Sequence, residues 1–129
     1  MEDYMKAEFR SELTATLITD RTWRLHEPLV FYSDILKQEV IVPKDFFTDF
    51  ASVRRVPFIF DFLGDEAHEA AVIHDYLYKK NSIPVVEREI ADDIFDEAMI
   101  ASDIWKWRRM IFYYGVRIGG ELFYHKHSL

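Results

Sequence analysis

Apolar and polar positions alternate in the first third of the chain, with the period of two that is typical of β-strands with one exposed face. The alternation is carried by LTATLIT (13–19). The runs that follow are short and rich in β-branched or aromatic residues: WRL (23–25), LVFYSD (29–34) and EVIVP (39–43). Asp20-Arg21 and the segment from Asp34 to Gln38 supply turns between them. The pattern predicts an antiparallel β-meander of three or four short strands in a β-rich region, residues 1–44.

The alternation stops in the next segment, residues 45–64, which reads DFFTDFASVRRVPFIFDFLG. The apolar residues of this stretch have no regular spacing, but it contains more aromatic residues than a solvent-exposed linker would. We therefore expect a packed loop.

A helical period then continues to the end of the chain and predicts three helices, at about 65–80, 84–101 and 103–125. Pro84 suits the first turn of the second helix, and Ser102 or Asp103 suits the cap of the third. Apolar residues with helical spacing face the core from the second helix: Ala91, Ile94, Phe95 and Ala98. The predicted fold is thus an α+β single domain that covers residues 1–129.

Composition supports one folded domain, because half of the 129 residues are apolar and 16% are aromatic. A net charge of −7 argues against general nucleic-acid binding. The absence of cysteine excludes disulfides and thiolate metal sites. The sequence shows no signal peptide and no transmembrane helix. We therefore expect a soluble protein made in a cytoplasm.

The candidate chemistry centres on AAVIHDYLY (70–78), where His74 and Asp75 interrupt an apolar run. Tyr78 lies one turn beyond His74 on the same side of the helix. The short link to the second helix makes that helix an antiparallel neighbour, so its Asp92 can accept a hydrogen bond from one nitrogen of His74. The other nitrogen would then be available as a general base.

A metal site is a second hypothesis for this region. Asp49 in the packed loop and Asp75 on the helix could, with backbone carbonyls and water, complete the oxygen shell of a Ca²⁺ ion. The alternative is that the His-Asp pair is a satisfied polar network that fixes helix packing, with Asp49 as a turn or cap residue. The residues alone leave both interpretations open.

The chain resembles the phage-associated family called domain of unknown function 1353. The similarity is carried by IVPKDFFTDFASV (41–53), AAVIHDYLY (70–78) and ADDIFDEAM (91–99). The resemblance implies a phage or prophage protein that is made in the host cytoplasm. It would be either a virion component or a small module that binds a protein partner or the phage particle.

HDYLY also resembles the His-Asp-x-x-Tyr helix of phospholipase A2 enzymes of the bacterial and fungal type. The resemblance implies a phospholipase A2-like antiparallel helix pair and Ca²⁺-dependent hydrolysis of phospholipid or another ester. In those roles His74 is the base, Asp92 orients it, and Tyr78 is a supporting donor. Asp75 and Asp49 would bind the calcium.

Two other features stay open. A metal phosphohydrolase of the His-Asp superfamily would need a further ligand histidine, and neither His26 nor His68 has suitable spacing. The third helix is rich in aromatic residues, and Lys106 and Arg108 lie beside Trp107. It is interpreted as a core helix with a solvated charged face, although a lipid or nucleic-acid patch and a homo-oligomer interface are alternatives.

Overall fold

The computed structural model describes residues 6–19, 22–48 and 67–119. Within these ranges, six strands come first: β1 (Glu8–Phe9), β2 (Ala15–Leu17), β3 (Trp23–Leu25), β4 (Leu29–Ser33), β5 (Gln38–Val42) and β6 (Phe47–Thr48). Three helices lie in the last of the ranges: α3 (His68–Tyr78), α4 (Arg88–Ala101) and α5 (Lys106–Gly119). The α+β class is confirmed.

The strands form two three-stranded antiparallel sheets, ordered β1-β4-β5 and β2-β3-β6, where the sequence predicted one meander. The chain passes between the sheets three times, from β1 to β2, from β3 to β4 and from β5 to β6. The second passage is at His26–Pro28, an exposed bend between the buried Leu25 and Leu29. Each sheet also contains a strand of only two residues, β1 in the first sheet and β6 in the second. Neither strand has a periodic pattern. Strand β6 falls in the predicted packed loop, and residues 49–64 of that loop lie outside the described residues.

The second helix begins at Arg88, four residues later than predicted. The side chain of Ser82 donates to the carbonyl of Pro84 (3.0 Å), and the N–H of Ile83 donates to the Tyr76 hydroxyl (2.9 Å). These contacts hold the segment after α3 in a turn. Glu87, with φ −74° and ψ 159°, is still extended.

The third helix begins at Lys106, because Ser102 closes the second helix and does not open the third. The Ser102 hydroxyl and N–H both donate to the carbonyl of Ala98, at 3.0 and 3.1 Å. Asp103 then takes a left-handed conformation, with φ 61°, and reverses the chain. The part of the predicted third helix beyond Gly119 lies outside the described residues.

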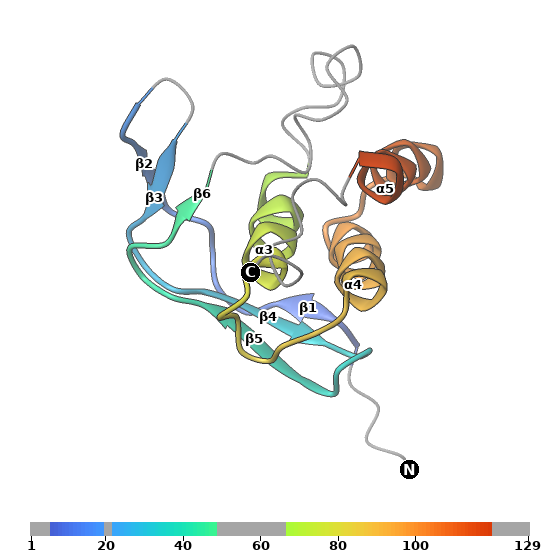
Figure 1. The fold of residues 1–129 in the computed structure, drawn as a ribbon, viewed down its shortest axis with the longest axis horizontal. Coiled ribbons are helices and arrows are strands. Elements are labelled where there is room, and N and C mark those ends of the chain that lie inside the picture. Colours follow the sequence, from blue (N-terminus) through green and yellow to red (C-terminus); the bar gives the residue numbers. More distant parts are fainter. Residues whose placement is uncertain (1–5, 20–21, 49–66, 120–129) are drawn as a thin grey trace.

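Helices α3 and α4 lie side by side on one face of the β1-β4-β5 sheet, and α5 packs against α4 (Figure 1). The core between them is made of fully buried apolar side chains from both layers, which include Phe31, Val40, Ile73, Phe95 and Phe112. Within the described ranges, no helix has the length and apolar character needed to cross a membrane.

Candidate functional site

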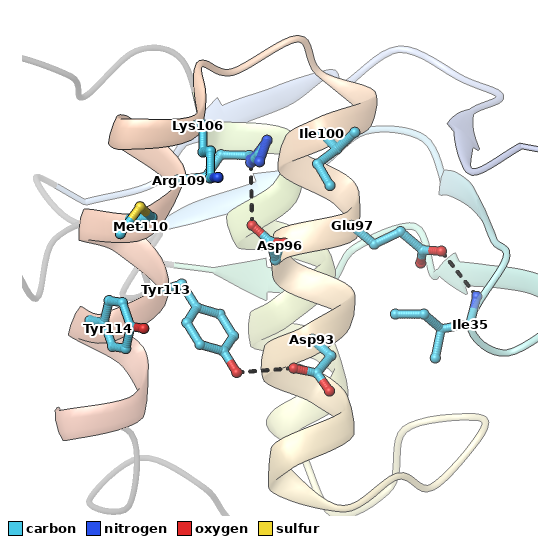
Figure 2. A pocket seen from close by; sticks show the side chains of 10 residues that line it. All are labelled: Ile35, Asp93, Asp96, Glu97, Ile100, Lys106, Arg109, Met110, Tyr113 and Tyr114. Atoms are coloured by element: carbon cyan, nitrogen blue, oxygen red, sulfur yellow. Dashed lines mark hydrogen bonds and ion pairs between the residues drawn. The ribbon is translucent and has the colours of Figure 1, made fainter.

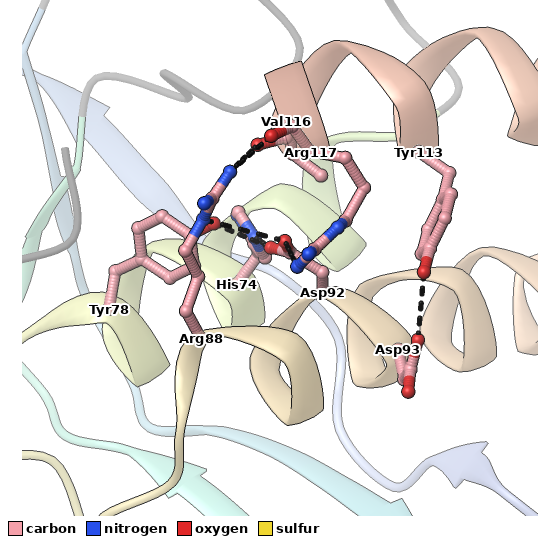
Figure 3. Close-up of polar contacts among 8 residues, drawn as sticks. All are labelled: His74, Tyr78, Arg88, Asp92, Asp93, Tyr113, Val116 and Arg117. Atoms are coloured by element: carbon pink, nitrogen blue, oxygen red, sulfur yellow. Dashed lines mark hydrogen bonds and ion pairs between the residues drawn. The ribbon is translucent and has the colours of Figure 1, made fainter. Parts of the chain in front are cut away.

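His74 and Asp92 meet at the centre of the contact between α3 and α4. The Nε2 atom of His74 is 2.6 Å from Oδ1 of Asp92, and both side chains have no exposed surface (Figure 3). The periodic patterns put His74 among the small alanines of α3 and Asp92 beside the apolar stripe of α4. The contact expected from antiparallel helices is therefore present, whereas the chemical role of the pair stays a prediction.

Tyr78 binds the same carboxylate oxygen as His74. Its hydroxyl donates to Asp92 Oδ1 at 2.5 Å, and its ring lies 4.1 Å from the imidazole, centroid to centroid. The ring of Phe95, one turn after Asp92, lies 4.7 Å from the imidazole. Aromatic surfaces from two helices thus fix the plane of His74 and exclude water from its hydrogen bond.

Two arginines complete the network, and the sequence did not single out either of them. Arg117 on α5 donates from its NH1 group to Asp92 Oδ2 at 2.9 Å (Figure 3). Arg88, one turn before Asp92, has its Nε 3.9 Å from the same oxygen and donates through NH2 to the carbonyls of Val116 and Arg117. The contact between Arg88 and Asp92 could have been predicted from their i, i+4 spacing on one helix.

The network keeps Asp92 ionised. Burial by itself would raise the pKa of this carboxyl, but hydrogen bonds from His74, Tyr78 and Arg117 outweigh burial and hold the pKa below its ordinary value. The carboxylate can only accept, so His74 Nε2 must carry a proton in this contact. Burial, and then the bond to Asp92, raise the pKa of Tyr78 above its ordinary value, so its phenol stays a donor.

Of the two predicted calcium ligands, Asp75 lies in the described part of the chain. Asp75 is on α3 next to His74 in sequence, and its carboxylate lies 3.8 Å from Nζ of Lys79. Asp49 lies outside the described residues. Among the residues that are described, no cluster of three or more acidic or histidine side chains could hold a metal ion.

A groove of about 560 Å³ between α4 and α5 is a second candidate site (Figure 2). Its acidic side chains already have partners. Asp93 accepts from the Tyr113 hydroxyl at 3.0 Å, and Asp96 lies 3.4 Å from Nε of Arg109. Glu97 accepts from the N–H of Ile35 at 3.0 Å. These contacts join α4 to α5 and to the β4–β5 turn, and they give the groove no assembled set of metal ligands.

Comparison with known families gives a match to the family described as "Protein of unknown function (DUF1353)", over residues 23–116. The matched span includes β3 to β6, the helix pair and the first part of α5, and so contains His74, Tyr78, Arg88 and Asp92. Comparison with curated proteins and with solved structures gives no significant match. The chain belongs to the DUF1353 family.

Proposed function

We propose that this protein is a non-catalytic binding module, encoded by a phage or prophage, whose buried His-Asp network fastens its helices together. The observation that carries the proposal is the state of Asp92. Its carboxylate is fully buried, and it already accepts from Arg117 as well as from His74 and Tyr78.

The charges around Asp92 favour a structural role. A histidine that acts as general base needs its carboxylate partner to stabilise the imidazolium that forms when it takes a proton. Here the guanidinium of Arg117 lies 2.9 Å from that carboxylate, and Arg88 lies 3.9 Å from it. A proton on His74 would add a third positive group around one negative charge. The arginines thereby weaken the effect on which a catalytic dyad depends.

The network also connects every described helix. His74 and Tyr78 come from α3, Arg88 and Asp92 from α4, and Arg117 from α5. A buried network of this kind, with one carboxylate held by donors from three helices, fixes helix register and is costly to break. The association with a phage particle or a protein partner rests on the family resemblance, and detection of the chain in purified particles by mass spectrometry would test it.

A catalytic assay tests the non-catalytic part of the proposal. The purified protein is given a chromogenic fatty ester with Ca²⁺ or with a chelator, and wild type is compared with His74→Gln. Glutamine can still donate to Asp92 but cannot act as a base, so this variant separates folding from chemistry. We expect the rate to equal the protein-free blank in every case. A Ca²⁺-dependent rate that falls by about 100-fold or more in His74→Gln would refute the proposal.

That outcome would favour the second candidate, a Ca²⁺-dependent phospholipid or ester hydrolase. The observation in its favour is that His74 and Tyr78 bind one oxygen of Asp92 across an antiparallel helix pair, as the phospholipase A2 resemblance implies. His74 would be the base and Asp92 its orienting acid. Asp75→Asn and Asp49→Asn would then abolish the calcium dependence, whereas the non-catalytic proposal expects neither variant to change the response of thermal stability to Ca²⁺.

A further inference from the structure

Strand β5 is an edge of the β1-β4-β5 sheet, and no described strand pairs with its outer side. The directions of the hydrogen bonds that β4 makes show which backbone groups of β5 face outward. The carbonyl of Val30 on β4 accepts from the N–H of Arg10, and the N–H of Val30 donates to the Ser11 hydroxyl, both at 2.8 Å. The main-chain groups of Val30 therefore point away from β5.

Backbone groups alternate in direction along a strand, so the main-chain groups of Phe31 point toward β5, where the register pairs Phe31 with Val40. By the same alternation, Glu39 and Ile41 direct their N–H and C=O groups to the open side of β5. Neither makes a backbone hydrogen bond on that side with any described residue. This edge is a ready template for one more strand.

An apolar groove of about 740 Å³ lies beside this edge. It runs from β5 past the corner before β6 to the turn after α3, and its lining includes Ile41, Phe47, Tyr76, Lys79 and Ile83. Ile41 is 48% exposed, Phe47 55% and Ile83 74%. Exposed apolar side chains gathered in one concave place indicate a binding surface.

We propose that the edge of β5 binds an extended segment of a partner protein as an added strand, an inference that rests on the proposed role as a binding module. Main-chain bonds form with Glu39 and Ile41, and an apolar side chain of the segment enters the groove beside Ile41. A lysine or arginine of the segment lies opposite Glu39, whose Oε2 accepts from Arg10 (3.0 Å) and whose Oε1 faces no described donor.

Charge decides between a foreign segment and a second copy of this chain. Each copy carries a net charge of −7, while at the edge itself Glu39 is paired with Arg10 and Lys79 lines the groove. The net charge makes two copies repel each other, whereas it attracts a segment with basic residues to the protein. The groove is also concave, and it suits alternating side chains of an extended peptide.

Amide hydrogen exchange measured residue by residue by NMR tests the proposal directly. The probe is a capped peptide with a lysine and a valine two positions apart, so that both side chains lie on the face that Glu39 and Ile41 present. Its counter-probe is the same peptide with methylated backbone nitrogens. In the free protein, the Glu39 and Ile41 amides should exchange faster than that of Val40. The probe at about ten times its Kd should slow Glu39 and Ile41 about tenfold, and the counter-probe should have no effect.

Three variants separate backbone from side-chain effects. Ile41→Pro removes an outward N–H that the β4–β5 ladder does not use, so the fold should persist while the affinity for the probe falls at least about tenfold. Ile41→Thr keeps the N–H and should bind more weakly than wild type but better than Ile41→Pro. Ile100→Thr is the matched control, because Ile100 is 51% exposed on α4, and it should bind normally.

The proposal is overturned if the probe leaves Glu39 and Ile41 unprotected, or if Ile41→Pro or the methylated peptide binds as well as its parent. It is also overturned if both amides are protected without peptide and light scattering gives a dimer mass, because a second copy would then occupy the edge. If Ile41→Pro fails to fold, the wild-type exchange pattern with the two peptides still decides. Ester hydrolysis is measured separately, so failure of the binding-module proposal is distinguishable from failure of this one.

Discussion

Replacing Asp92 with asparagine changes one side of the buried network and spares the other. The two oxygens of Asp92 have separate partners: Oδ1 accepts from His74 and Tyr78, and Oδ2 accepts from Arg117. Asparagine can keep its oxygen toward His74 and Tyr78. Its NH2 group then faces the Arg117 donor at 2.9 Å and lies near Arg88, so donors oppose donors where an ion pair was.

The size of the effect follows from this geometry. Removing one partner of a buried ion pair costs about 3–5 kcal/mol. The side chain of Arg117 keeps 30% of its surface exposed and so part of its hydration, which lowers the expected loss to about 2–4 kcal/mol. Arg117→Met removes the guanidinium but keeps much of the stem, and it should cost about 1–3 kcal/mol.

Urea unfolding followed by circular dichroism measures these losses, provided that the dependence on urea is unchanged among the variants. The double variant Asp92→Asn/Arg117→Met should be more stable than the sum of the single effects predicts, by about 1–3 kcal/mol, because no guanidinium then faces the asparagine. A loss below about 1 kcal/mol for Asp92→Asn, or single effects that add within about 0.5 kcal/mol, would refute the reasoning.

Further predictions concern the same network. The pKa of Asp92 is lower in the folded state than its unfolded value of 3.8. The ionised carboxylate therefore contributes its whole stabilising free energy above pH 3.8, and this contribution is lost as the pH falls through the folded pKa. The difference in urea midpoint between wild type and Asp92→Asn should therefore shrink in acid. Tyr78→Phe should cost about 1–3 kcal/mol because it removes a buried donor to a carboxylate, whereas Tyr113→Phe, whose hydroxyl binds the exposed Asp93, should cost less than about 1 kcal/mol. Phe95→Ala should cost about 3–5 kcal/mol, measured in the same way, because its fully buried ring packs on His74.

Local patterns in the sequence were sufficient to predict the helix pair and the contact inside it. The short connection after α3 makes α4 antiparallel, and the helical period then brings Asp92 close to His74 and Tyr78. Arg117 could not be placed in this way. It is 25 residues beyond Asp92 on another helix, and its position depends on the left-handed Asp103, which sets how α5 returns along α4.

The division of the strands into two sheets also depends on contacts between distant residues. Strand β1 pairs with β4, matching Glu8 with Tyr32, and β3 pairs with β6, matching Arg24 with Phe47. Both added strands have only two residues, too few to show a period. Alternation predicted the strand at β2, and the content of β-branched and aromatic residues predicted β3, β4 and β5, but pairing of this kind is decided by tertiary packing.

Helices α4 and α5 each donate hydrogen bonds to the other, and this restricts which part of the protein is accessible for function. Arg88 near the start of α4 donates to the carbonyls of Val116 and Arg117, and Arg117 on α5 donates back to Asp92 on α4. Moving that part of α5 away from α4 would break both sets of contacts and leave the charge of Asp92 without Arg117. Chemistry at His74 that needed such an opening would therefore have to break the ion pair of Arg117 with Asp92 and the hydrogen bonds of Arg88 to α5. The outward groups of Glu39 and Ile41 require no such opening, and this is the physical reason to test for a partner at the β5 edge.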